Sequence, residues 1–181
     1  YVTVKNLLNG EIYEEKYDKL ILSPGARPIV PRIPGIENVN IFTIRNVVDI
    51  DKLNKYVKSV DTKDIAVIGG GFIGVEVAEN LKQSGYNVSL IEGTDQILRP
   101  FDYDMVQIFH KEIYDKGVNL IVGDKVEKFE ENQVILSSGK TIDAKVVVMA
   151  IGVTPEINLA KEVGLEIGQT GAIKTDKNYK T

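Results

Sequence analysis

The chain has 181 residues, of which 43% are hydrophobic and 27% charged, and its net charge is −4. This composition is typical of a globular protein with one good core, and the lack of any long basic run argues against binding to nucleic acid or to a membrane surface. No apolar stretch approaches the roughly 20 residues that cross a bilayer, and the absence of cysteine excludes disulfides, thiolate catalysis and cysteine-ligated metals within the chain.

The first 35 residues predict short strands followed by a linker. Alternating runs at 1–5 and 12–17 flank Asn9-Gly10, which is a strong hairpin signal. Residues 19–23 (KLILS) predict a short buried strand. Three prolines within residues 28–35 indicate an extended linker and the best candidate for a domain boundary.

The centre of the chain predicts alternating helices and strands. Apolar residues at helical spacing predict a helix over 46–59. An apolar strand over 64–69 then runs into Gly69-Gly70-Gly71, a helix over 72–84 follows, and a second apolar strand over 87–92 ends in Glu92.

The remaining elements complete an α/β pattern. Residues 102–116 predict a helix, in which the single His110 is a surface or partly buried residue rather than a metal ligand. A strand over 118–122 and a nearly continuous apolar strand over 145–151 are expected in a parallel sheet. Three short runs between these strands predict an antiparallel meander (124–129, 132–137 and 140–143). After the second strand, residues 165–175 predict a further hairpin.

The order of strand, glycine turn, helix, strand and acid is the pattern that binds the ADP half of a dinucleotide. Gly69 allows the tight turn, Gly71 lets the backbone approach a pyrophosphate, and Gly74 lets the helix pack close to the strand. The helix N-terminus offers unpaired N–H groups to the phosphates. Glu92 stands near the position, roughly 20 residues on, of the acid that binds the adenosine ribose. An ordinary glycine-rich turn is the alternative.

We therefore predict an α/β fold: a Rossmann-like parallel sheet with a β-meander crossover, flanked by strand-rich segments. Residues 36–155 would form the dinucleotide-binding domain. Residues 1–35 and 156–181 would be stubs of a parent domain into which this unit is inserted, and the first residue, Tyr1, suggests a segment excised from a longer protein.

Three segments resemble the pyridine nucleotide-disulfide oxidoreductases, which are flavoproteins that bind two dinucleotides. GGGFIGVEVA (69–78) resembles the nicotinamide-side fingerprint of that family, and LILSPGARP (20–28) and MAIGVTPE (149–156) resemble the motifs on either side of it. LSPGA and IFTIRN (41–46) look most like the coenzyme A-disulfide reductase, NADH oxidase and NADH peroxidase branch. The resemblance implies that the stubs belong to a parent FAD domain.

The resemblance also implies roles for residues near the nicotinamide. Phe72 would cover the nicotinamide pocket and move when NADH enters, or it simply packs at the start of the helix. Ile73 would line the same pocket. Glu76 would face a lysine near the flavin, or it is solvated. Gly152 would let the nicotinamide approach the backbone, and Gly70 completes the set of cofactor-binding residues.

The sequence thus predicts a domain that binds NADH in a flavoprotein that passes hydride to FAD and on to a disulfide, peroxide or oxygen. Its expected partners are NADH and the rest of a homodimeric, cytoplasmic parent, with no nucleic acid, membrane or metal. The segment alone is expected to bind NAD(H), to lack catalytic residues and to be inactive. Because Glu92 is acidic and no cation follows it before Arg99, NAD(H) is expected to bind better than NADP(H).

Two other functions fit the same residues. The glycine turn could hold FAD itself, since flavin fingerprints share the glycines and the acid, although such a fingerprint normally opens its chain. A stand-alone nucleotide-sensing module is the other alternative, because a Rossmann unit does not by itself reveal a redox role.

Overall fold

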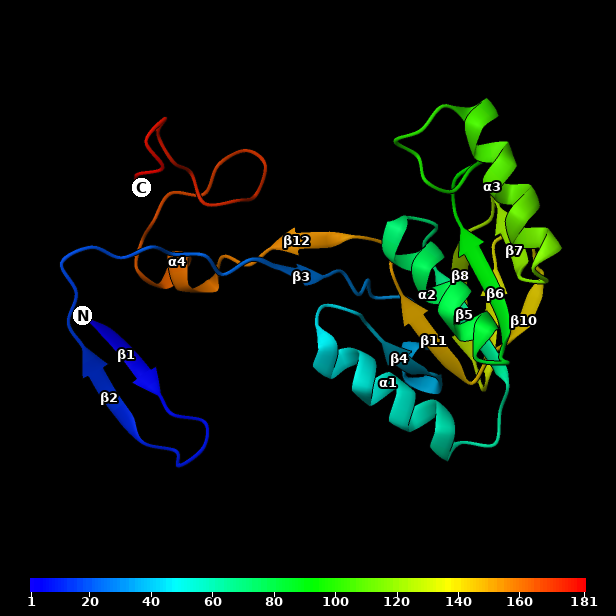
Figure 1. The fold of residues 1–181 in the computed structure, drawn as a ribbon, viewed down its shortest axis with the longest axis horizontal. Helices are drawn as coiled ribbons and strands as arrows, with labels where there is room; N and C mark the ends of the chain where they lie inside the picture. The colour runs from blue at the N-terminus through cyan, green and yellow to red at the C-terminus, as the bar shows by residue number, and fades with distance from the viewer. The chain divides into compact units, whose positions relative to one another are not determined.

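The computed structural model describes residues 1–181, which form two compact units. The larger unit comprises residues 26–154, and the smaller comprises residues 1–25 together with 155–181. Figure 1 shows the elements of each unit along the chain. The predicted linker over 28–35 lies within the larger unit.

The larger unit is built on a five-stranded sheet in which every pairing is parallel. The strands lie in the order β4 (Asn40–Phe42), β11 (Val146–Met149), β5 (Asp64–Ile68), β6 (Asn87–Glu92) and β7 (Asn119–Val122). Four of these strands were predicted. The sequence pattern did not reveal β4, which has only three residues and no clear alternation.

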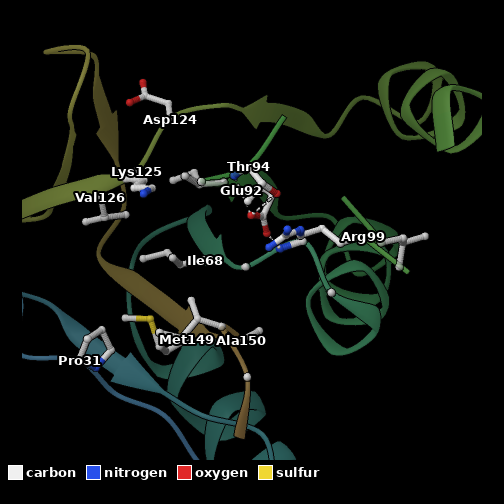
Figure 2. Close-up of a pocket in the computed structure, with 18 of the residues that line it drawn as sticks. Pro31, Ile68, Glu92, Thr94, Arg99, Asp124, Lys125, Val126, Met149 and Ala150 are labelled. Carbon is white, nitrogen blue, oxygen red and sulfur yellow. Dashed lines mark hydrogen bonds between the residues drawn. The ribbon is translucent and has the colours of Figure 1, made fainter. Parts of the chain in front are cut away.

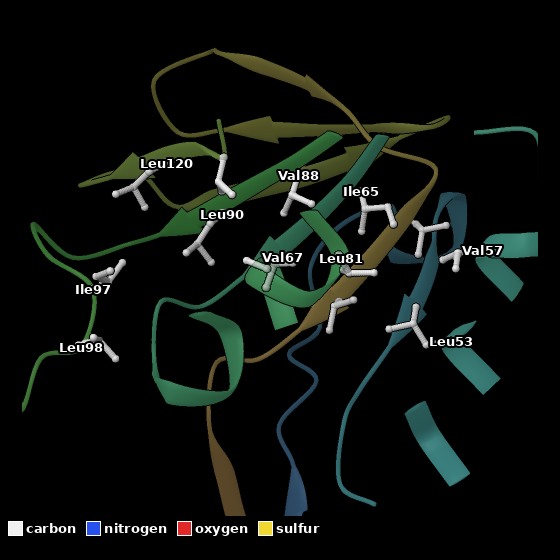
Figure 3. Close-up of a cluster of buried hydrophobic side chains, with 14 of the residues drawn as sticks. Leu53, Val57, Ile65, Val67, Leu81, Val88, Leu90, Ile97, Leu98 and Leu120 are labelled. Atoms are coloured by element: carbon white, nitrogen blue, oxygen red, sulfur yellow. The ribbon is translucent and has the colours of Figure 1, made fainter. Parts of the chain in front are cut away.

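Three helices pack on one face of this sheet: α1 (Val47–Ser59), α2 (Phe72–Gln83) and α3 (Tyr103–Asp115). Their apolar residues and those of the strands form a single buried cluster, drawn in Figure 3. The predicted bounds of all three helices are correct to within one residue. None of the helices is long and apolar enough to cross a membrane.

The opposite face of the sheet is covered by the predicted meander. It consists of β8 (Val126–Glu130), β9 (Gln133–Leu136) and β10 (Thr141–Asp143), paired antiparallel. Residues of β5 divide between the two faces as the alternation of a strand requires: Ile65 and Val67 join the helix-side cluster, whereas Ala66 and Ile68 join the meander-side cluster. The fold is therefore a Rossmann-like sheet between helices and a meander, as predicted.

The proline-rich segment is anchored rather than free. The carbonyl of Pro34 accepts a hydrogen bond of 2.8 Å from the N–H of Phe129 in the meander. A Cβ on Gly35 would lie 1.9 Å from the Phe129 oxygen, so only glycine permits this approach. The short strand β3 (Ala26–Pro28) leads into this segment and pairs with β12 (Val153–Pro155). The 3₁₀ turn η1 (Ile36–Asn38) follows the segment.

The smaller unit holds little regular structure. The predicted hairpin is confirmed as β1 (Val2–Lys5) paired antiparallel with β2 (Ile12–Glu15). The predicted hairpin over 165–175 is reduced to one bridge between Ile167 and Ile173, which follows a short helix, α4 (Asn158–Glu162). The expectation of a strand-rich C-terminal flank is therefore wrong.

The predicted strand over 19–23 is also wrong. These residues have no regular secondary structure, and the side chain of Ile21 is 89% exposed. The run of apolar residues satisfied the strand pattern, but a strand also needs a neighbour to pair with its backbone, and none lies beside this segment in its unit.

Candidate dinucleotide-binding site

The sheet has a switch point between β5 and β11. From β5 the chain proceeds through β6 to β7 on one side, then returns through the meander to β11 on the other side of β5. Ligands of open α/β sheets bind outside the carboxyl ends of the strands at such a point. A cavity of about 550 Å³ opens there, and Figure 2 shows its lining. Its volume is in the range of small-molecule sites.

Gly69, Gly70 and Gly74 are required by close packing around the turn. Gly69 has φ +106°, and a Cβ on it would lie 2.4 Å from the carbonyl oxygen of Ala150 in the neighbouring segment. A Cβ on Gly74 would lie 1.8 Å from the Gly69 oxygen, and a Cβ on Gly70 would lie 2.5 Å from the side chain of Ile97. The lack of a side chain at these three positions lets the turn pack closely against the segment after β11, against the start of α2 and against the loop that follows β6.

Gly71 differs from the other glycines of the turn. A Cβ on it would meet no atom within 4 Å, although the residue lines the cavity. It is the N-cap of α2, and no side chain caps this helix end. The first N–H groups of α2 therefore have no partner within the helix and stand at an open wall of the cavity. This arrangement fits a pyrophosphate, whose oxygens would accept from these groups.

Glu92 ends β6 at the same edge, and its carboxylate is held on both oxygens. Oε2 accepts from the Gly70 N–H at 2.7 Å. Oε1 accepts from the N–H of Thr94 at 2.9 Å, and the Thr94 hydroxyl lies 2.8 Å from the same oxygen. The acid is thus fixed between the glycine turn and the loop after β6, where the ribose of a bound dinucleotide is expected.

The loop after β6 is tied to the turn by its own backbone. Leu98 adopts a left-handed conformation with φ +49°, and its N–H donates to the Gly70 carbonyl at 2.8 Å. The Ile97 N–H donates to Nε2 of His110 at 3.4 Å. His110 is buried, and desolvation lowers its pKa below the usual value. This histidine is more buried than predicted, because it supports the loop.

Sequence reasoning missed two cations that line the cavity, Arg99 and Lys125. Arg99 lies in the loop after β6, and Figure 2 shows its guanidinium directed toward Glu92. Lys125 immediately precedes β8, and its stem covers Gly93, where a Cβ would lie 2.8 Å from the Lys125 Cγ. The order of the strands could have revealed both residues, because the segments that follow neighbouring parallel strands meet at one edge of the sheet.

The other end of the cavity is formed where β11 ends. Gly152 lines it with φ +126°, a conformation that favours glycine, and its carbonyl accepts from the Ile29 N–H at 3.0 Å. Phe72 lines the cavity, is 62% exposed, and contacts Phe101 edge-to-face at 6.0 Å between ring centroids.

Two predicted site residues lie outside this cavity. Ile73 is 45% exposed, and Glu76 lines a second cavity, between α2 and α3, where its Oε1 accepts from the Asn80 side chain at 3.2 Å. Their predicted roles beside a flavin stay predictions. No group of three or more histidine, cysteine, aspartate or glutamate residues is placed to hold a metal ion.

Comparisons with known proteins agree on one family. The family model described as pyridine nucleotide-disulphide oxidoreductase matches residues 1–181. The chain is 34% identical to an NADH oxidase of Enterococcus faecalis over 186 residues, covering 99% of this chain and 41% of the relative. It is 33% identical to an NAD(P)H coenzyme A polysulfide/persulfide reductase of Pyrococcus horikoshii over 185 residues, covering 100% of this chain and 41% of the relative.

A solved structure shows the same relationship. The crystal structure of reduced Bacillus anthracis CoADR-RHD is similar with a TM-score of 0.92 and 44% sequence identity, covering 98% of this chain and 32% of that chain. The chain thus spans about two fifths of the length of its curated relatives. The predicted family and branch are confirmed, and the chain belongs to the pyridine nucleotide-disulphide oxidoreductases.

Proposed function

We propose that residues 36–155 are the NADH-binding domain of a flavoprotein oxidoreductase. The observation that carries this proposal is the uncapped N-terminus of α2 at Gly71, which opens on the cavity at the switch point of the sheet. The relatives described above are named for reactions of NADH or NAD(P)H. In the parent, FAD would accept hydride from the nicotinamide and pass electrons to a disulfide, peroxide or oxygen.

In this proposal the two ends of the cavity bind the two halves of the coenzyme. The pyrophosphate lies against Gly71 and the first N–H groups of α2, and the adenosine ribose lies against Glu92. The nicotinamide lies near Gly152, where the positive φ and missing side chain leave the backbone accessible. Phe72 covers this end until the nicotinamide enters, since its ring is largely exposed and its ring contact is a T-shaped one with Phe101.

We further propose that residues 1–35 are a stub of the FAD domain of a homodimeric parent together with a linker, which is the stretch anchored on the larger unit, and that residues 156–181 return to that FAD domain. Ala160 is the one buried residue of the smaller unit, in contrast to the well-packed sheet of the larger one. Apolar side chains such as Ile21 and Leu8, which are 89% and 98% exposed, would be covered by the rest of the parent.

The test is a titration of NADH into the chain, followed by the change in its fluorescence. Gly71→Val should abolish binding, because the branched side chain fills the space meant for the pyrophosphate. Circular dichroism should show an unchanged fold, since a Cβ here meets no protein atom.

Gly168→Val is the matched control, because it adds the same side chain at a glycine that has no unusual φ and only ordinary contacts of 3.7 Å or more. It should bind NADH like the original chain. Retained affinity in Gly71→Val would show that the turn has only a structural role and would refute the proposal.

A further inference from the structure

We propose that His110 and Gln96 are positioning residues for coenzyme binding. Through the loop after β6, residues 93–102, they hold the glycine turn and Glu92 in place for the adenosine half of NADH. This inference rests on the proposed function, because it assigns a role at the same site. Neither His110 nor Gln96 lines the cavity, so both act on the coenzyme through the loop and not by contact.

These two residues are the buried polar side chains of the chain. His110 is 7% exposed and Gln96 is 9% exposed, whereas the other buried side chains are hydrophobic. A polar side chain costs free energy to bury unless it forms hydrogen bonds, and an apolar residue of similar size would pack without that cost. Both residues direct a hydrogen bond to the backbone of the same loop, although His110 belongs to α3. The loop is therefore their common purpose.

The loop needs these bonds because it lacks regular secondary structure. Residues 93–102 form neither helix nor strand, so their buried backbone groups must find partners elsewhere. The N–H of Ile97, a fully buried residue, donates to Nε2 of His110 at 3.4 Å. The Phe101 carbonyl accepts from Nε2 of Gln96 at 2.9 Å. Removal of either side chain leaves a backbone group of the loop without its partner, and the loop must shift to find another.

The loop also holds a conformation that it would not adopt by itself. Leu98, beside Ile97 in Figure 3, has φ +49°, a left-handed conformation that is unfavourable for a residue with a Cβ. Such strain persists only where the surroundings fix the backbone, and it is concentrated at functional sites. The bonds from His110 to Ile97 and from Gln96 to Phe101 lie on the two sides of Leu98 along the chain. They therefore help to maintain the strained conformation.

A shift of the loop reaches the coenzyme site through two contacts. The Ile97 side chain packs so close to Gly70 that a Cβ on this glycine would lie 2.5 Å from it, and the Gly70 N–H donates to Glu92 at 2.7 Å. On the other side, the Thr94 hydroxyl lies 2.8 Å from Glu92 Oε1 and 3.0 Å from the Gln96 carbonyl oxygen. The position of the ribose-binding acid and of the glycine turn thus depends on the loop.

The experiment measures NADH binding by fluorescence titration and 5′-ADP binding by competition. Both are measured at pH 8, where His110 is neutral because burial lowers its pKa below the usual value. His110→Leu and Gln96→Met each remove one hydrogen bond to the loop and keep a side chain of similar size. His110→Gln is the rescue variant, since its amide oxygen and the histidine Nε2 stand the same number of bonds from Cα.

Asn46→Ala is the control for lost stability. It removes the N-cap of α1, a helix that does not line the cavity. Circular dichroism before each titration shows whether the variant is folded. A change in Kd among folded variants that Asn46→Ala does not share then reports on the loop and not on stability.

His110→Leu and Gln96→Met should each raise the Kd of NADH at least fivefold. The Kd of 5′-ADP should rise by a similar factor, because the disturbed contacts lie at the adenosine half of the site. His110→Gln should stay within twofold of the original chain for both ligands, and Asn46→Ala should leave both unchanged. If His110→Leu does not fold, Gln96→Met and His110→Gln still decide the question, through loss in the first and retention in the second.

Three results would overturn the inference while leaving the proposed function intact. The first is an unchanged Kd in the folded apolar variants, which would make the two bonds purely structural. The second is a loss of affinity in His110→Gln or Asn46→Ala as large as in the apolar variants. The third is a loss of NADH affinity with 5′-ADP binding retained, which would place the effect at the nicotinamide. Failure of the original chain to bind either ligand would instead refute the proposed function.

Discussion

At the scale of single residues, Gly74 and Gly71 lie three positions apart and serve different purposes. A Cβ on Gly74 would overlap the Gly69 carbonyl oxygen at 1.8 Å, so α2 must shift away from β5 to accommodate it. Gly74→Ala should lower the free energy of unfolding by about 1–3 kcal/mol, the usual cost of overpacking. Gly71→Ala should change it by less than about 0.5 kcal/mol, because its Cβ projects into open space. Urea unfolding of both variants checks this, and equal losses would contradict it.

His110 should make stability depend on pH. Burial lowers its pKa in the folded state, so the unfolded chain takes up this proton first as the pH falls. The free energy of unfolding should therefore be highest above pH 6.5 and decrease as the pH falls below that value, until the folded histidine is protonated as well. Protonation of Nε2 also removes the acceptor for the Ile97 N–H.

The measurement is urea unfolding between pH 5.5 and pH 7.5, and the control is His110→Gln, whose amide oxygen can still accept from Ile97. This variant should show a flatter profile, because His110 is the only histidine of the chain. An equal slope in both proteins would assign the dependence to carboxylates instead.

At the scale of elements, α1 depends on its first turn. The side chain of Asn46 accepts from the N–H groups of Val48 and Asp49, and the Asp49 carboxylate accepts from the Asn46 N–H, which completes a capping box. Asn46→Ala should cost about 1 kcal/mol of stability. NADH affinity should not change, since α1 does not line the cavity. Denaturant unfolding and titration together test this, and a loss of affinity at unchanged stability would contradict it.

The elements also show which features a sequence can predict. The segment from β5 through Glu92 was predicted almost residue by residue, because its glycines, helix spacing and acid act within one short stretch. Lys125 was missed because it is distant in sequence from the glycine turn. The connection from β7 to β8 places its side chain over Gly93, and no local pattern records that contact. The apolar run at 19–23 was misjudged for a related reason, since periodicity records burial and not the presence of a pairing neighbour.

At the scale of the whole molecule, the buried side chains are concentrated in residues 26–154. The chain has one glycine turn with an open helix N-terminus at a sheet edge, and we assign it to NADH. We therefore expect the isolated chain to be colourless and without NADH oxidase or disulfide reductase activity, because it offers no second turn for FAD and no cysteine.

Expression with added FAD, followed by an absorbance scan and an assay of NADH consumption, checks this expectation. The scan should show no flavin band after desalting. A stoichiometric yellow protein that consumes NADH would reassign the turn from Gly69 to Gly71 to the flavin.

The pairing of β3 with β12 brings the two ends of the larger unit together. A unit whose entry and exit are neighbours can be inserted into a host chain at a single surface position without separating the halves of the host. Such a unit can be exchanged between hosts as a cassette, with its coenzyme site intact, because the cavity is lined only by residues between those two strands. Joining the ends directly would give a closed backbone for circular permutation, with the sheet and the coenzyme site left unchanged.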